Sequence, residues 1–65
     1  MGNQGMRLRA ARGETPRKEV CQAVGISLSA LMMYENGKRS PRDAIKYRLA
    51  RYYRKSVDEL FFADQ

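Results

Sequence analysis

The stretch VCQAVGISLSALMMYENG, residues 20–37, decides the fold of this chain. Apolar residues recur at helical spacing on both sides of Gly25. They are Val20, Val24, Ile26, Leu31 and Tyr34. Gly25 stands where a tight corner between two helices needs a residue without a Cβ atom. The stretch therefore predicts two short helices joined by a glycine turn, with one face of the second helix left outside the core.

The charge of the chain indicates the kind of partner that this exposed face meets. The 65 residues form one small domain, with 13 Lys and Arg against 7 Asp and Glu, a net charge of +6. Such an excess of positive charge favours a polyanionic partner. A basic chain with an outward-facing second helix fits the helix-turn-helix arrangement, in which that helix enters the major groove of DNA.

Several other classes of function are excluded by residues that the composition lacks. There is no histidine for a catalytic triad, and a lone cysteine, Cys21, can form neither an internal disulfide nor a zinc site by itself. No Gly-rich phosphate loop, no apolar run of about 20 residues and no signal peptide is visible. We therefore expect a protein that is not an enzyme, that needs no cofactor or metal, and that works in the reducing cytoplasm.

Cap and turn residues predict the first three helices. A helix over Met6–Arg12 should end at Gly13 in the left-handed conformation. Thr15-Pro16 has the form of a helix start, with a hydroxyl cap followed by proline at the first helical position, and this helix should run to about residue 24. Ser27 is the expected cap of the next helix, which runs to about residue 36 and ends before Gly37.

The last two helices are predicted by the same signals. Ser40-Pro41 repeats the cap-plus-proline start, and Asp43 lies in the favourable first turn. Ser56 and Glu59 form a capping box for a short final helix. The fourth helix should bury a single apolar stripe, made of Ile45, Leu49 and either Tyr52 or Tyr53.

Together these residues resemble a known family. The chain is similar to the Cro/repressor-type helix-turn-helix domains, the XRE-like transcriptional regulators of bacteria, phages and mobile elements. The resemblance covers about residues 6–62 and is strongest in GIS (25–27), YENGKRSP (34–41) and SVDELF (56–61). It implies an all-α, lambda-repressor-like bundle of five helices with a central helix-turn-helix. It also implies sequence-specific binding of double-stranded DNA, with a recognition helix over residues 27–36.

The resemblance further implies roles for individual residues. The small residue that the family has inside its second helix falls on Cys21, which we expect to pack closely there. The family often joins an arginine of its first helix to the glutamate of the ENG motif, which implies an Arg9–Glu35 ion pair. Arg17 stands where relatives often place a phosphate-binding glutamine. The full set of implied phosphate contacts is Arg17, Ala30, Asn36, Lys38, Arg39 and Arg42. A solvated face away from DNA is expected for Lys46, Arg48, Arg51 and Arg54.

The base-reading face departs from the family pattern. By resemblance the base-reading residues are Leu28, Ser29 and Met33, where relatives often have Arg, Gln, Ser or Thr. Ser29 can hydrogen-bond to most bases, and the two apolar side chains could contact thymine methyl groups. Alternatively, Leu28, Met32 and Met33 form a protein-binding patch, as in an antirepressor or an antitoxin-like adaptor.

These observations lead to one interpretation of the whole chain. We expect a flexible segment over residues 1–5, a DNA-binding domain over residues 6–62 and a short tail over residues 63–65. The domain should act as a repressor or Cro-like regulator associated with the nucleoid. It is a possible homodimer, with Phe62 as the best candidate for the seam among the C-terminal aromatic residues.

Overall fold

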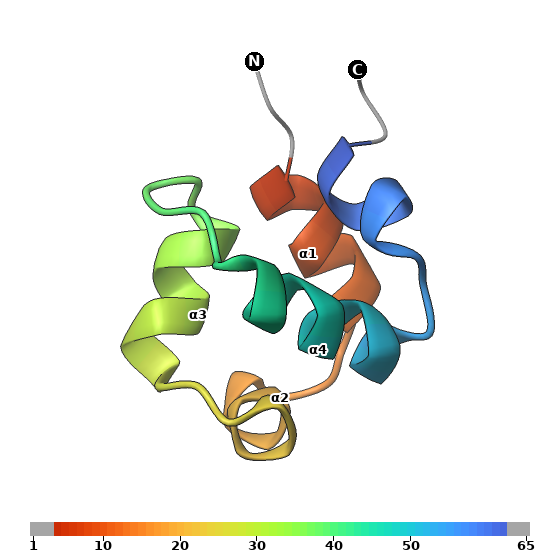
Figure 1. The fold of residues 1–65 in the computed structure, drawn as a ribbon. Helices are drawn as coiled ribbons and strands as arrows, with labels where there is room; N and C mark the ends of the chain where they lie inside the picture. The colour runs from red at the N-terminus through yellow and green to blue at the C-terminus, as the bar shows by residue number, and fades with distance from the viewer. Residues whose placement is uncertain (1–3, 63–65) are drawn as a thin grey trace.

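The computed structural model describes residues 4–62, which are helical apart from the turns that join the helices. The elements are α1 (Gln4–Arg12), α2 (Arg17–Val24), α3 (Leu28–Glu35), α4 (Asp43–Tyr53) and a final π-helical turn, η1 (Asp58–Phe62). Figure 1 shows α3 on one side of the molecule and η1 on the other, with α1 and α4 between them and α2 below. The expected all-α architecture of five helices is confirmed. Over residues 4–62, none of these helices is long and apolar enough to span a membrane.

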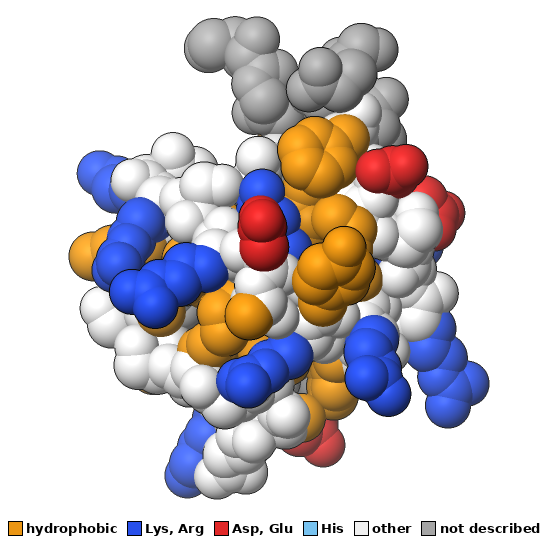
Figure 2. Space-filling view, viewed as in Figure 1, with side chains coloured by type: hydrophobic (Ala, Val, Ile, Leu, Met, Phe, Trp, Pro, Cys, Tyr) orange, Lys and Arg blue, Asp and Glu red, His pale blue; other side chains and the backbone are white. Residues whose placement is uncertain are grey.

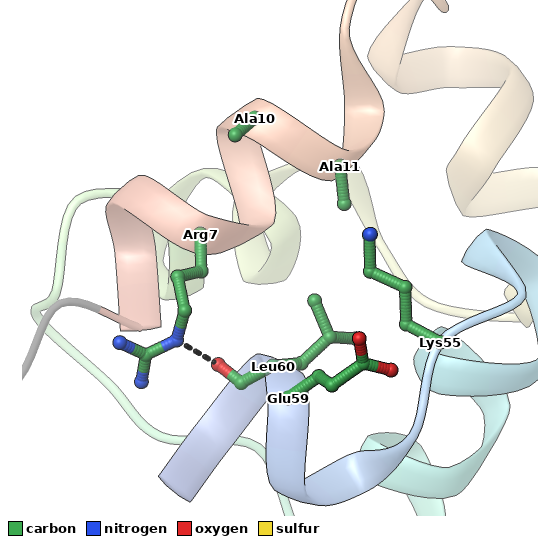
Figure 3. A pocket seen from close by; sticks show the side chains of 6 residues that line it. All are labelled: Arg7, Ala10, Ala11, Lys55, Glu59 and Leu60. Atoms are coloured by element: carbon green, nitrogen blue, oxygen red, sulfur yellow. Dashed lines mark hydrogen bonds between the residues drawn. The ribbon is translucent and has the colours of Figure 1, made fainter. Parts of the chain in front are cut away.

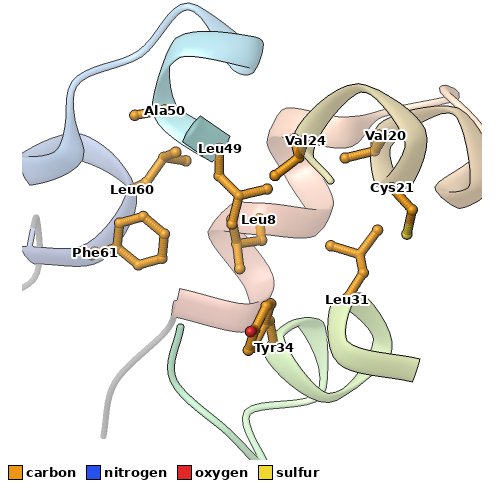
Figure 4. Close-up of a cluster of buried hydrophobic side chains, with 10 residues drawn as sticks. All are labelled: Leu8, Val20, Cys21, Val24, Leu31, Tyr34, Leu49, Ala50, Leu60 and Phe61. Atoms are coloured by element: carbon orange, nitrogen blue, oxygen red, sulfur yellow. The ribbon is translucent and has the colours of Figure 1, made fainter. Parts of the chain in front are cut away.

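One apolar core joins all five elements. Leu8 of α1 and Leu49 of α4 lie at its centre, where both are fully buried, and Figure 4 shows the other members around them. The buried cluster consists of Leu8, Val20, Cys21, Val24, Leu31, Tyr34, Leu49, Ala50, Leu60 and Phe61. The apolar residues at helical spacing in residues 20–37 are therefore the half of the core that α2 and α3 contribute, and Ile26 packs against its edge.

Cys21 is buried where α2 meets α3, as its assignment to the family's small packing position requires. Its thiol donates a hydrogen bond to the Ser27 carbonyl, with 3.5 Å between sulfur and oxygen. Burial, and after it the nearby carboxylate of Glu35, raises the pKa of this thiol. A thiol held in its neutral form behaves as a small apolar group, so Cys21 serves packing.

The caps of α3 form as predicted. The Ser27 hydroxyl accepts a hydrogen bond from the Ala30 N–H at 3.0 Å and so begins the helix. Beyond the other end, Gly37 takes the left-handed conformation at φ 75°. There the Lys38 N–H donates to the Met33 carbonyl at 2.9 Å, which is the long hydrogen bond of a Schellman motif. The capping box of Ser56 and Glu59 also forms, with reciprocal bonds of 2.9 and 3.0 Å.

The prediction that Pro16 and Pro41 are each the first residue of a helix is wrong. Helix α2 begins at Arg17, and Pro16 precedes it in an extended conformation with no side-chain cap hydrogen bond. Helix α4 begins at Asp43, two residues beyond Pro41, with Arg42 at the capping position. Both prolines stand just outside their helices, where the carbonyl of Pro16 accepts the first helical N–H groups and Pro41 is buried. These helices begin without a hydroxyl cap.

The first helix begins at Gln4, earlier than the expected start at Met6. Gly5 is buried inside it, and a Cβ atom at this position would overlap the Glu35 carbonyl and lie 3.3 Å from the Gly37 nitrogen. The first turn of α1 therefore lies directly against the end of α3, an approach that only glycine allows. The rest of the expected N-terminal segment, residues 1–3, and the expected tail, residues 63–65, lie outside the described residues.

We expect replacement of Tyr53 by phenylalanine to stabilise the protein. The Tyr53 hydroxyl is buried, and nothing in the part of the chain that the structure describes hydrogen-bonds to it. Removal of an unsatisfied buried polar group should add about 1 kcal/mol to the free energy of unfolding at pH 7. Urea unfolding of the variant checks this, with Tyr47→Phe as the control, since Tyr47 is 63% exposed.

The same substitution should also change how stability depends on alkaline pH. Burial, with a smaller effect of Glu35, raises the pKa of Tyr53 to about 12. The unfolded chain loses this proton near pH 10 whereas the folded protein keeps it, so stability falls as pH rises from about 10 to 12. The fall attributable to Tyr53 is at most about 2.7 kcal/mol, and Tyr53→Phe should lack it. Equal losses in both proteins between pH 9.5 and 11.5 would contradict this assignment.

Candidate nucleic-acid interface

The corner between α2 and α3 turns the outer face of α3 toward solvent. Gly25 makes the corner at φ 85°, and its N–H donates to the Cys21 carbonyl at 2.8 Å. Leu31 and Tyr34 hold the inner face of α3 in the core. Figure 1 shows α3 at the edge of the molecule, with the turn that follows it extending above. One side of a short, firmly anchored helix is thus open to a partner.

The outer face of α3 carries the residues predicted to read bases. Leu28 is 50% exposed, Met33 is 39% exposed, and Ser29 between them in sequence is exposed as well. Met32, at 42% exposure, completes the same strip because it lies one helical turn beyond Leu28. We call Leu28, Ser29, Met32 and Met33 the α3 strip. Ala30 lies beside it, partly buried against the core.

Positive charge gathers next to the α3 strip. Lys38 and Arg39, in the turn after α3, and Arg42, just before α4, are all exposed. Figure 2 shows Lys and Arg side chains gathered over the side of the molecule where Figure 1 draws this turn. A cleft of about 340 Å³ opens between α3 and α4, and Arg39 and Arg42 line it together with Arg48. These cations lie together on the α4 side of α3, where they could meet a phosphate backbone.

Arg48 is exposed, as expected of a solvated residue, but it also lines this cleft beside α3. Its Nη1 donates to the Val24 carbonyl at 3.4 Å, so the guanidinium lies at the end of α2, close to the corner at Gly25. The sequence carries a signal for this position, since Arg48 follows Ile45 by three residues and shares its helix face. Ile45 packs against the core and lines the same cleft.

Lys46 also differs from its expected role. Its side chain is only 15% exposed, and its Nζ atom lies 5.0 Å from the ring centre of Phe62 and 5.6 Å from that of Phe61. Attraction to the aromatic rings compensates this cation for the hydration that it loses on burial. Phe62 remains 41% exposed. Arg51 and Arg54, at the far end of α4, are exposed as expected.

A buried carboxylate connects α1, α2 and α3 behind the strip. The Glu35 side chain is fully buried and accepts hydrogen bonds from Arg12 Nε at 2.7 Å, Arg12 Nη2 at 3.2 Å and Arg17 Nε at 2.9 Å. The expected Arg9–Glu35 pair is wrong, because Arg9 donates to Asn36 Oδ1 at 2.9 Å. Side chains on a helix point toward its N-terminus, which carries the Glu35 carboxylate away from Arg9 and toward the end of α1.

This ion pair affects two of the expected phosphate contacts. Arg17 Nε donates a hydrogen bond to Glu35, and the Arg17 side chain is 37% exposed. The guanidinium therefore lies between a buried carboxylate and solvent. Asn36 is exposed, and its Oδ1 is held by Arg9. The side-chain NH2 group of Asn36, which is a donor only, is the part suited to a phosphate.

A cleft on the other side of the molecule has no part in this surface. It has a volume of about 370 Å³ and lies between α1 and the segment that leads into η1. Figure 3 shows Arg7 Nε donating to the Leu60 carbonyl across it, at 2.8 Å. Hydrogen bonds from the Ser56 cap hold Glu59 and lower the pKa of its carboxyl group. The hydrogen bond from Arg7 to Leu60 therefore joins α1 to η1 across this cleft.

Comparison with known proteins agrees with this geometry. A family model described as helix-turn-helix matches residues 6–60, which is most of the chain. No curated protein and no solved structure shows significant similarity to this chain.

Proposed function

Because this chain belongs to the helix-turn-helix family, as its resemblance to the XRE-like regulators indicated, we propose that it is a small repressor or Cro-like regulator of transcription. This is a DNA-binding family and not typically an enzymatic one. In the proposal, α3 enters the major groove of a specific operator and the protein acts by occupying that site, without chemistry. The observation that carries it is the exposed α3 strip with exposed Lys and Arg side chains beside it.

The contacts to the DNA backbone would come from both ends of the helix-turn-helix. Lys38, Arg39 and Arg42 would bind phosphates beyond the C-terminal end of α3, with Asn36 beside them. At the other end, Arg17 would bind a phosphate from the start of α2, and the small Ala30 would allow the backbone to approach. With Arg48 from the cleft beside α3, these cations would neutralise about five phosphates, which gives a slope of about −5 for log K against log salt concentration.

Two copies of the protein would bind two half-sites. Phe62 and Tyr47 are exposed at 41% and 63%, and they line one shallow hollow with Val57 at the junction of α4 and η1. Figure 2 shows apolar side chains over this junction. A seam between two such patches would relate two α3 helices by a two-fold axis, about one turn of DNA apart.

A second candidate function uses the same strip to bind a protein. Leu28, Met32 and Met33 are all at least 39% exposed, and methionine-rich surfaces adapt to protein partners. On this hypothesis the chain is an antirepressor or antitoxin-like adaptor that binds DNA weakly or without sequence preference.

Selection of bound duplexes from a random pool separates the two candidates. We expect one enriched motif, and an affinity for it that falls with salt at a slope of about −5. The motif should bind at least about 1,000-fold more tightly than the unselected pool. No enrichment, with only a steep loss of affinity in salt, would contradict a sequence-specific regulator and leave the protein-binding hypothesis.

A further inference from the structure

The composition of the α3 strip limits how it can distinguish base pairs. Base edges in the major groove are read chiefly by Arg, Lys, Asn and Gln through paired hydrogen bonds, and the strip contains none of these residues. Its one polar side chain, Ser29, is compatible with any base. The hydroxyl of the preceding Ser27 already accepts the Ala30 N–H. Discrimination by this face must therefore come from apolar contact.

The apolar group that the major groove offers is the methyl group at pyrimidine C5. Thymine carries it, and 5-methylcytosine carries it at the same ring position, whereas cytosine and uracil do not. We propose that the α3 strip recognises C5-methyl groups, so that the protein binds thymine and 5-methylcytosine and discriminates against unmethylated cytosine. The inference rests on the proposed function, since it requires α3 to lie in the major groove.

The spacing of the strip predicts where these methyl groups lie. Leu28 and Met33 are five residues apart, which is about 7.5 Å along the helix axis, or about two base-pair steps. Leu28 and Met32 share one helix face and are 50% and 42% exposed. The methyl-sensitive positions should therefore fall within two or three adjacent base pairs of each half-site.

The surroundings of the strip favour this occupant over an apolar protein surface. Two exposed cations, Lys38 and Arg39, lie in the turn that follows α3. The one acidic residue of α3, Glu35, is buried and neutralised by arginines behind the strip. An apolar strip framed by positive charge is complementary to a groove that has methyl groups on its floor and phosphates along its edges.

The experiment compares three forms of the duplex recovered by selection. In the first form each thymine of the motif is replaced in turn by deoxyuridine, which removes only the methyl group. In the second, each cytosine is replaced by 5-methylcytosine, and the third is the unmodified duplex. We expect Kd to rise about fourfold for each contacted methyl group that is lost. We expect a similar gain in affinity where 5-methylcytosine places a methyl group at a contacted position.

Variants assign the effect to the strip. The Leu28→Ala, Met33→Ala double variant should bring the ratio of the uracil and thymine Kd values close to one. Met6→Ala, which shortens an apolar side chain that is 68% exposed on α1 and lies outside the strip, should leave that ratio unchanged. A ratio taken within one protein is independent of any small loss of stability.

The outcomes separate this inference from the proposed function. A selected motif bound equally well with and without its methyl groups would overturn the inference and leave the proposed function standing. A methyl effect that survives in the double variant would also overturn it. Failure to select any motif would overturn both the inference and the proposed function. Binding of a protein to the α3 strip would then explain why the strip is exposed.

Discussion

Replacement of Glu35 by glutamine should leave the protein largely unfolded at room temperature. The Glu35 carboxylate is fully buried and accepts hydrogen bonds from Arg12 and Arg17. Glutamine has nearly the same shape but carries no charge, and its NH2 group would face the two guanidinium groups. Loss of one partner from a buried ion pair costs about 3 to 5 kcal/mol. A domain of 65 residues has little stability beyond that amount.

Urea unfolding followed by circular dichroism measures this effect. The matched control is Glu14→Gln, which neutralises an exposed carboxylate in the turn after α1 and should change the free energy of unfolding by less than about 0.5 kcal/mol. Arg17→Gln should be intermediate, because the Arg17 side chain is 37% exposed whereas that of Arg12 is 15% exposed. A Glu35→Gln variant as stable as its control would show that the carboxylate is not needed.

Local features of the fold are predictable from sequence because they depend on neighbouring residues. The corner at Gly25, the Ser27 cap and the end of α3 at Gly37 each follow from one or two residues and their backbone preferences. The apolar periodicity of residues 20–37 likewise places Leu31 in the core. Resemblance to a family then orders these elements, which composition alone cannot do.

Contacts between distant segments are not predictable in this way. The residues next to Gly5 predict a flexible end, yet the end of α3 lies against this glycine. The partner of Glu35 depends on where α1 crosses α3 and on the direction of the side chain, which selects Arg12 over Arg9. Arg48 joins the candidate interface because α4 packs against α2. Each of these outcomes is set by the packing of whole helices.

The candidate site likewise has a part that the sequence predicts and a part that it does not. The exposure of Leu28, Ser29 and Met33 was predictable, because a helix held in the core by one face exposes the opposite face. What these side chains contact is a property of the partner. For that reason the roles of the α3 strip and its flanking cations are proposals that binding measurements must test.

The Lys38→Ala, Arg39→Ala double variant should bind all DNA sequences at least about 100-fold more weakly at physiological salt. Hydrogen bonds between charged groups contribute about 1.5 to 3 kcal/mol each, and these two residues would each lose one phosphate. Because two fewer counterions are released, the salt dependence of log K should become less steep by about 1.8. The preferred motif should stay the same, since phosphate contacts carry no sequence information. Titration of labelled duplexes at several salt concentrations measures both quantities.

The control must separate position from net charge. The Arg51→Ala, Arg54→Gly double variant also lowers the net charge of +6 by two, but at the end of α4 that leads toward η1 in Figure 1. Glycine is chosen at residue 54 because Arg54 has φ 59°, which glycine adopts without strain from a Cβ atom. If Lys38 and Arg39 contact phosphates, this control should keep the salt slope of the unmodified protein. Its affinity should fall by less than about fivefold, because the lower net charge weakens only the long-range electrostatic attraction to DNA. Equal losses in both variants would mean that net charge alone attracts DNA, and the docking of the turn after α3 on the backbone would then have to be abandoned.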